Sequence, residues 1–254
     1  MIKNIIQNIL KKKGYEIVKP DTRLVKEGLP ADFDDQTVEI IKQTKPYTLT
    51  TPERVASLVN AINYIVKNNI EGDIVECGVW KGGSSMAAMA ALIKQNDVSR
   101  DVYLYDTFEG MSEPTENDKV FSGTSAEQML KSSDIEDASS VWCYSSIDEV
   151  KANVATIGYP DFKIHFVKGK VEDSIPKTIP NKIAILRLDT DWYESTKHEL
   201  EHLYPLLVSG GVLIIDDYGH WEGARKAVDE YISIHQLQIL LNRIDYTGRI
   251  AIKP

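Results

Sequence analysis

The sequence is short of cysteine and has no long hydrophobic run. Its two cysteines, Cys77 and Cys143, form no Cys-x-x-Cys motif, which excludes a disulfide scaffold and a zinc ribbon and favours a reducing compartment. We therefore expect a cytoplasmic protein. No apolar run approaches the roughly 20 residues of a membrane-spanning helix. The apolar N-terminal residues 2–10 precede three lysines, the reverse of the order in a signal peptide, so we expect no membrane partner.

Basic residues are scarce relative to acidic ones. The 254 residues contain 29 Lys and Arg against 38 Asp and Glu, which gives a net charge of −9. A surface that binds a nucleic-acid backbone needs clustered Lys and Arg. We therefore expect no nucleic-acid partner. A chain of this length buries enough apolar surface to fold without a structural metal, so a bound metal would serve chemistry.

Two parts of the chain differ in pattern. Residues 1–50 combine a short amphipathic helix with a stretch rich in charge and proline, which we interpret as an arm or lid. Residues 51–254 begin with Thr51-Pro52, a sequence typical of a helix N-terminus, and then alternate apolar runs with helical stretches. The N-terminal helix is typical of one that packs on the domain or on a second subunit, so we expect a homo-oligomer, most simply a dimer.

The alternating pattern predicts an α/β fold. Apolar runs such as DIVECGV, DVYLYDTF and IAILRLDTD are each followed by helical or polar stretches. Strands that are apolar on both sides indicate a mostly parallel sheet with helices on both faces. The tail, with a turn at Thr247-Gly248, predicts an antiparallel hairpin at one edge. The polar insertion 111–145 follows a strand, where such segments often close over a site.

Ligands of open α/β sheets bind at the carboxyl ends of the strands. The first strand ends in ECGVWKGGSS, where Gly78 would allow a ligand close to the backbone. Asp106 ends the second strand and could accept both hydroxyls of a ribose. Together these features predict a ligand that contains adenosine. The turn is not G-x-G-x-x-G, which counts against the alternative of an NAD-dependent sugar-nucleotide enzyme.

Three aspartates follow two later strands. Asp189 ends LRLD, and Asp216 and Asp217 end LIIDD. Adjacent parallel strands would bring these carboxylates to one rim, where their repulsion calls for a neutralising group. Mg²⁺ prefers oxygen ligands and keeps positions open for substrate. The alternative is that the carboxylates cap helices or pair with Lys and Arg.

Four segments carry a family resemblance: ECGVWKGGSS, YDTFEGM, LRLDTDWYEST and GGVLIIDDYGHWEGARKAVDEY. In this order they resemble the macrocin O-methyltransferase family, which methylates sugar hydroxyls of macrolides and related natural products. The resemblance runs from about Tyr47 to Tyr231. It implies a class I methyltransferase fold, with a seven-stranded sheet whose last strand is antiparallel, and Mg²⁺-dependent methyl transfer from S-adenosylmethionine. The resemblance also implies that the acceptor is a small sugar or a glycosylated molecule. The alternative is a non-sugar hydroxyl of a secondary metabolite.

The resemblance also implies roles for residues. The metal would be held by Asp189, Asp216 and Asp217. The cofactor would be bound by Glu76, Gly78, Val79, Trp80, Asp106, Phe108 and Gly110, with Val171 and Glu172 at the adenine by position. The arm and the insertion 111–145 match no family motif, and these segments are where we expect the acceptor to bind.

For the chemistry we propose Asp189 as the general base, since a carboxylate at the metal can reach the same hydroxyl. His220 is the rival base, and its alternative is a surface histidine. Trp192, Tyr193 and Trp221 would stack on the acceptor or serve as packing anchors. A buried Arg187 would need an acidic partner. His198 and His202 have the spacing of a metal pair but no third ligand, so we interpret them as a solvated helix face.

A non-catalytic binding module with the same fold is the remaining alternative. The three crowded aspartates count against it, because a module that only binds would have no reason to keep them.

Overall fold

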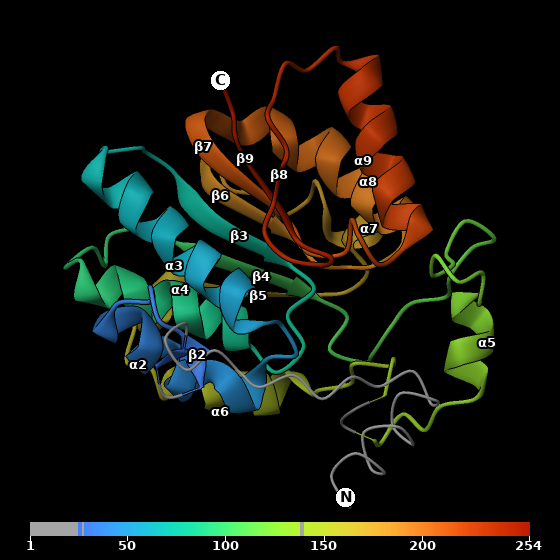
Figure 1. Cartoon of the computed structure of the whole chain (residues 1–254), viewed down its shortest axis with the longest axis horizontal. Coiled ribbons are helices and arrows are strands. Elements are labelled where there is room, and N and C mark those ends of the chain that lie inside the picture. Colours follow the sequence, from blue (N-terminus) through green and yellow to red (C-terminus); the bar gives the residue numbers. More distant parts are fainter. Residues whose placement is uncertain (1–24, 27, 138–139) are drawn as a thin grey trace, which may run out of the picture. The chain divides into compact units, whose positions relative to one another are not determined.

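The computed structural model describes residues 25, 26, 28–137 and 140–254 (Figure 1). They belong to two compact units, Met1–Val38 and Glu39–Pro254. In the first, the short strands β1 (Val25–Lys26) and β2 (Leu29–Pro30) pair antiparallel. The helix expected at residues 2–10 lies outside the described residues. The second unit begins before the boundary that the sequence suggested after residue 50.

The second unit contains a seven-stranded sheet in the order β5-β4-β3-β6-β7-β9-β8. Five strands run parallel: β3 (Asp73–Cys77), β4 (Val102–Asp106), β5 (Ile164–Lys168), β6 (Ile183–Leu188) and β7 (Leu207–Ile215). The tail forms the predicted hairpin, with β9 (Arg249–Ile252) antiparallel to both β7 and β8 (Asn242–Arg243). The sequence-based fold class is therefore confirmed.

Helices cover both faces of the sheet (Figure 1). One face carries α3 (Pro52–Lys67), α4 (Gly83–Lys94) and α6 (Ile147–Ala155), and the other carries α7 (Val171–Ser174), α8 (Tyr193–Leu203) and α9 (Glu222–Ile234). Helix α2 (Asp35–Thr44) spans the boundary between the two units. The short 3₁₀ helices are η1 (Lys45–Tyr47), η2 (Asp161–Lys163) and η3 (Tyr204–Leu206).

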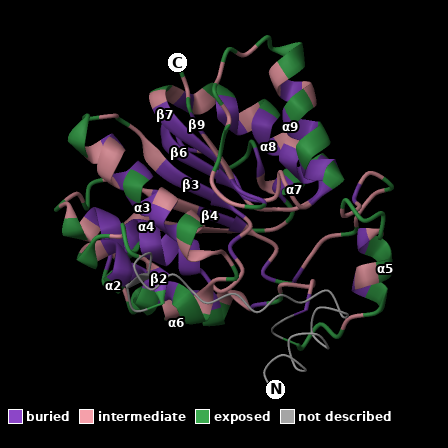
Figure 2. Ribbon diagram, in the orientation of Figure 1, coloured by how far each residue is buried: buried purple, intermediate pink, exposed green. Residues whose placement is uncertain are grey.

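The central strands form the core, shown in purple in Figure 2. All six residues of β6 are buried, whereas the edge strand β8 is exposed. This difference follows from the layers, because a central strand of a doubly covered sheet has no face toward water. Among the described residues, no helix is both long and apolar enough to cross a bilayer.

The strand register brings four strand ends to one level. Cys77 pairs with Tyr105 and Leu188, and Leu188 pairs with Ile215. Hydrogen bonds continue this register for one more residue, since the amide of Asp189 donates to the Cys77 carbonyl at 2.8 Å and that of Asp216 to the Leu188 carbonyl at 2.9 Å. The polar residues that follow these strands therefore meet at one edge of the sheet.

The insertion 111–145 contains one short helix, α5 (Ala126–Lys131), among its described residues. Figure 1 shows α5 beyond the strands, apart from both helix layers. Its apolar residues Ala126 and Leu130 pack against Trp192 and Trp221. The insertion thus has a small core of its own against the loops that end β6 and β7.

Helix α3 begins as the sequence predicted, with Thr51 as its N-cap. The Thr51 hydroxyl accepts from the amide of Arg54 at 3.3 Å and donates to Asp245 Oδ2, in the C-terminal hairpin, at 2.7 Å. We expect Thr51→Ala to lower the free energy of unfolding by about 1–2 kcal/mol, the range for a lost N-cap. Urea denaturation measures the change.

The matched control is Ser146→Ala, which removes an N-cap of α6 that bonds only the Glu149 amide, at 3.3 Å. Thr51→Ala should cost more than this control, and Thr51→Ser should restore most of the loss. Equal costs for Thr51→Ala and Ser146→Ala would show that the bond to Asp245 contributes nothing.

Candidate active site

A cavity of about 740 Å³ lies at the carboxyl ends of the strands. Its walls come from residues 47–50, the turn after β3, the end of β4, the insertion, and the loops after β6 and β7. A smaller pocket of about 60 Å³ adjoins it and shares Gly78, Asp106 and Asp189. The position agrees with the rule for open α/β sheets.

The turn after β3 requires glycine at position 78. Gly78 has φ +82°, and a Cβ there would collide with the backbone carbonyl of Asp189. The absence of a side chain therefore lets the β3 turn lie directly against the end of β6. Both strand ends line the same cavity as a result.

Asp106 joins the β3 turn to the end of β4. Its Oδ2 accepts from the amides of Val79 at 2.6 Å and Trp80 at 3.1 Å, and its Oδ1 accepts from the amide of Phe108 at 2.6 Å. Burial raises the pKa of the Asp106 carboxyl, and the three amide donors oppose this rise. The carboxylate lines both pockets while it organises two turns.

Most of the other expected cofactor residues line one of the two pockets, and Phe108 lines neither. Trp80 lines the larger pocket, and its indole N–H is buried with no acceptor among the described residues. Gly110 lines both pockets, and Val171 and Glu172 line the smaller one. Phe108 is buried beside Phe166, with ring centroids 6.4 Å apart. The structure thus brings most of these residues to the same pair of pockets, and their contact with the cofactor stays a prediction.

Arg187, on β6, is the buried cation of the site. Its guanidinium bonds Glu76 Oε1 at 2.6 Å, Asp189 Oδ2 at 2.7 Å and Asp216 Oδ1 at 2.7 Å. Burial alone would lower the pKa of Arg187, but the three carboxylates raise it well above its usual value. The sequence predicted an acidic partner for a buried Arg187, and the structure shows three. The carboxylate of Glu76 accepts hydrogen bonds from both Arg187 and the Ser85 hydroxyl.

Asp216 has a second cation. Arg54, from α3, donates a hydrogen bond to Asp216 Oδ2 and forms an ion pair with Asp245, with 3.0 Å between its Nε and Asp245 Oδ2. Both carboxylate oxygens of Asp216 are therefore hydrogen-bonded to arginines. The sequence analysis left open that the three aspartates pair with basic residues instead of binding a metal. Asp216 does pair with basic residues.

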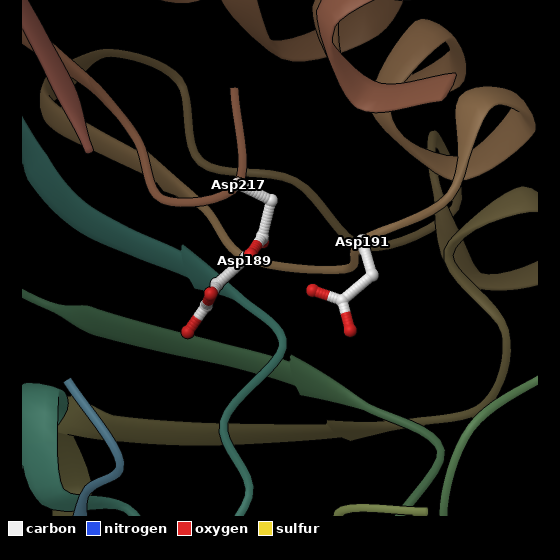
Figure 3. A group of neighbouring side chains, drawn as sticks. All are labelled: Asp189, Asp191 and Asp217. Atoms are coloured by element: carbon white, nitrogen blue, oxygen red, sulfur yellow. The ribbon is translucent and has the colours of Figure 1, made fainter. Parts of the chain in front are cut away.

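Three other carboxylates form a group that fits a metal ion: Asp189, Asp191 and Asp217 (Figure 3). One oxygen from each lies within 4.8 Å of the others. Asp217 Oδ2 is buried and has no hydrogen-bond donor among the described residues. The structure thus brings Asp189 and Asp217 together as expected, but the third member of this group is Asp191, with Asp216 beside it. An all-oxygen donor set with one orphaned oxygen suits Mg²⁺.

Crowding raises the pKa of each member of this group. Burial raises the pKa of Asp191 to about 7, and Asp189 and Asp216 add to the rise. Burial also raises the pKa of Asp189 and of Asp217 well above the usual value, with further contributions from the neighbouring aspartates. Burial and mutual repulsion therefore both disfavour the charged form of these three carboxyl groups.

Backbone strain gathers around the cavity. Three of its lining residues have a left-handed backbone conformation, which residues other than glycine rarely adopt: Trp80 (φ +47°), Cys143 (φ +44°) and Asp191 (φ +67°). Such residues cluster at functional sites because the surrounding structure must hold them there.

The aromatic residues singled out in the sequence have mainly packing roles. Trp192 and Trp221 pack edge to face, with centroids 4.9 Å apart, inside the small core of the insertion. Trp221 also lines the cavity, as does His220. Burial and nearby Arg54 lower the pKa of His220, whose Nδ1 lies 3.2 Å from the Tyr246 hydroxyl. His220 therefore remains a candidate base by position.

His198 and His202 bond backbone carbonyls at 3.0 and 2.8 Å. Both are half-buried on α8, so the solvated face expected for them is only partly solvated. Neither belongs to a group of possible metal ligands among the described residues.

The sequence analysis missed Asp191 and Arg54, whereas residues 47–50, which line the cavity, belong to the arm where we expected the acceptor to bind. Asp191 had a signal, since the D-x-D spacing in LRLDTDWY places a second carboxylate two residues after Asp189. Arg54 had none, because it reaches the site only when α3 packs beside the strand ends.

Known proteins share this architecture and these segments. A family model described as Macrocin-O-methyltransferase matches residues 19–251. The chain belongs to the macrocin O-methyltransferase family. It is therefore an S-adenosylmethionine-dependent O-methyltransferase, and the NAD-dependent and non-catalytic alternatives are wrong.

Relatives with assigned activities match this family member over most of its length. The 8-demethyl-8-(2,3-dimethoxy-alpha-L-rhamnosyl)-tetracenomycin-C 4'-O-methyltransferase of Streptomyces olivaceus is 29% identical over 248 residues, which are 98% of this chain and 89% of the relative. The mycinamicin III 3''-O-methyltransferase of Micromonospora griseorubida is 30% identical over 205 residues, 81% of this chain and 78% of the relative. The solved structure of the O-methyltransferase NovP has a TM-score of 0.69 at 26% identity, covering 98% and 97% of the two chains.

Asp106 provides a test of the cofactor site in this methyltransferase. We expect Asp106→Ala to weaken S-adenosylmethionine binding by at least about tenfold, because it removes a charged acceptor of three amides that hold the turns. Isothermal titration calorimetry measures the affinity. The control is Asp101→Ala, an acidic residue just before the start of the same strand that pairs with Lys163 and His165. Equal affinity in Asp106→Ala and the unmodified protein would refute the role of Asp106.

Proposed function

We propose that this enzyme transfers the methyl group of S-adenosylmethionine to a hydroxyl of a sugar, carried by a glycosylated natural product or a polysaccharide precursor, with Mg²⁺ held at the strand ends. The proposal rests on one observation: the carboxylates of Asp189, Asp191 and Asp217 lie together in the wall of the cavity. The turn after β3, where we expect the cofactor to bind, lines the same cavity. The relatives support the sugar, since their names give a rhamnosyl compound and a mycinamicin as substrates.

Asp189 and Asp217 are the residues we assign to the ion. Asp216 remains the third ligand proposed from the resemblance, and in the structure its carboxylate faces Arg187 and Arg54. A bound divalent cation would fix two neighbouring hydroxyls of the sugar and lower the pKa of the one that is methylated. The chain itself holds these carboxylates in place, because the guanidinium of Arg187 bonds both Asp189 and Asp216.

Removal of the proton is the second task of the chain. The sequence favoured Asp189, but the structure gives Asp189 an arginine partner at 2.7 Å. Asp191 lies in the same group, and no Lys or Arg of the described chain forms an ion pair with it. A carboxylate without a cationic partner is the better proton acceptor. Asp191 is therefore the preferred base of this proposal, with Asp189 as a ligand.

The charge of the cavity narrows the acceptor. Among its described lining residues, eight are Asp or Glu, and three of these, Glu76, Asp189 and Asp216, pair with arginines. The one arginine in the lining, Arg54, is itself already paired. The diphosphate of a nucleotide sugar would meet these carboxylates at short range, whereas a neutral glycoside would not. We therefore propose an uncharged glycoside as the acceptor, methylated after the sugar has been attached.

The acceptor and the metal are tested together. The protein is treated with EDTA, dialysed, and incubated with S-adenosylmethionine and one of three probes: methyl α-L-rhamnoside, a macrolide glycoside with free sugar hydroxyls, or dTDP-L-rhamnose. Mass spectrometry detects the methylated product. We expect methylation of a neutral glycoside only after MgCl₂ is added back. Full activity after chelation would refute the proposed dependence on a metal ion. A preference for dTDP-L-rhamnose would refute the proposal that the acceptor is an uncharged glycoside.

A catechol probe distinguishes the alternative of a non-sugar hydroxyl, because it offers two neighbouring oxygens without a sugar. Methylation of catechol in preference to both glycosides would favour that alternative.

Ligand and base are separated by two variants. Asp191→Asn should lower kcat by about 10²-fold or more, as expected for loss of a general base, and leave Mn²⁺ affinity within a few fold. Asp189→Asn should weaken Mn²⁺ binding, measured by electron paramagnetic resonance, as well as turnover. Unchanged turnover in Asp191→Asn would remove it as the base, and loss of Mn²⁺ binding in Asp191→Asn would make it a ligand.

A further inference from the structure

Asp118, an acidic residue of the insertion, is fully buried. Its Oδ1 accepts from the backbone amide of Tyr193, the first residue of α8, at 2.8 Å. The N-cap residue of α8, Trp192, makes no side-chain capping bond. A carboxylate is favourable at a helix N-terminus, where the first amides lack partners within the helix. Helix α8 is therefore capped from the insertion, 75 residues away in the sequence.

The rest of Asp118 organises the insertion. Its Oδ2 accepts from the Thr115 amide at 2.6 Å and the Thr115 hydroxyl at 3.0 Å. Its backbone carbonyl accepts from the amide of Ala126, where α5 begins, at 2.8 Å. One buried residue therefore fixes the first turn of the insertion, the start of α5 and the start of α8.

The start of α9 closes around the same carboxylate. A Cβ on Gly223 would collide with Asp118 Oδ1, so the glycine leaves room for the carboxylate. Next to it, the Glu222 amide donates to the Lys119 carbonyl at 2.8 Å, and Val120 forms a β-bridge with Trp221. The insertion thus spans the starts of both α8 and α9.

These two helix starts follow the two acidic loops. Asp191 lies two residues before Tyr193, and Asp217 lies in the loop that leads to α9. The insertion also supplies cavity wall, including Met129, Ser133 and Cys143. Asp118 is therefore bonded on one side to Thr115 and Ala126 of the insertion, the segment that supplies this wall, and on the other to the start of α8, which directly follows the loop that carries Asp191.

We propose that Asp118 is a positioning residue for methyl transfer: by capping α8 from within the insertion, it fixes the Asp189–Asp191 loop relative to the wall that holds the acceptor. The role of that loop rests on the proposed function. A cap within the helix would stabilise α8 equally well, but it would not tie the acceptor wall to the carboxylates.

Two variants disturb the contact in different ways. Asp118→Asn keeps the size but replaces one acceptor oxygen by a donor, so the side chain cannot accept from both Tyr193 and Thr115. Gly223→Ala leaves Asp118 intact and forces its carboxylate to move. Because both act on one contact, the double variant should be no worse than the worse single variant. Glu116→Gln is the control, an exposed neighbour with the same change of charge.

Hydrogen exchange measured by mass spectrometry reports the coupling without an acceptor. In Asp118→Asn and Gly223→Ala, we expect exchange to accelerate by about tenfold in residues 111–137 and also in residues 189–196. Mn²⁺ affinity should fall in both variants, while S-adenosylmethionine affinity and exchange in β3 and β4 stay as in the unmodified protein. Glu116→Gln should change none of these.

Acceleration confined to the insertion, with exchange in residues 189–196 and Mn²⁺ affinity unchanged, would overturn the proposal, since Asp118 would then only stabilise its own segment. An equal effect of Glu116→Gln would overturn it too. If the unmodified protein binds no Mn²⁺, the metal proposal fails, and the exchange in residues 189–196 alone decides the role of Asp118.

Discussion

The active site depends on the buried guanidinium of Arg187. This one cation bonds Glu76, Asp189 and Asp216, which end three adjacent strands of the sheet. Without it, parallel strands in register would bring uncompensated carboxylates together in a region from which water is excluded, at a cost of several kcal/mol. Arg54 adds a second positive charge at Asp216, from α3. The two arginines let the strand ends remain acidic and still pack.

This arrangement leaves one part of the acidic edge uncompensated. Arg187 and Arg54 satisfy Glu76 and Asp216, but Asp217 keeps an oxygen with no donor among the described residues, and the pKa of Asp191 is raised by burial to about 7. The carboxylates thus differ in their partners among the described residues: Glu76 and Asp216 pair with arginine, Asp191 and Asp217 do not, and Asp189 both bonds Arg187 and lies with Asp191 and Asp217. Under the proposed function, the group Asp189, Asp191 and Asp217 is where an acceptor hydroxyl would be bound and deprotonated.

Two segments far apart in the sequence complete the site. The glycine turn is held against the end of β4 by Asp106, and Gly78 lets it touch the backbone of Asp189. The insertion is held against α8 and α9 by Asp118. The glycine turn is therefore held by the sheet itself, whereas the insertion is attached through the buried Asp118 carboxylate, backbone contacts to the start of α9 and a small aromatic core.

Local patterns in the sequence sufficed to predict the fold class, the α3 N-cap at Thr51 and the C-terminal hairpin. The rule that ligands bind at strand ends placed the candidate site and predicted that Asp189 and Asp217 lie together, since each closely follows a strand. Folding of the whole chain was needed to show that Asp216 faces two arginines and that Asp191 joins the open group. Likewise, Arg54 reaches the site, and Asp118 the start of α8, through packing between elements distant in the chain, which no local spacing records. Side-chain partners across elements depend on rotamer and packing, and these exist only in the folded protein.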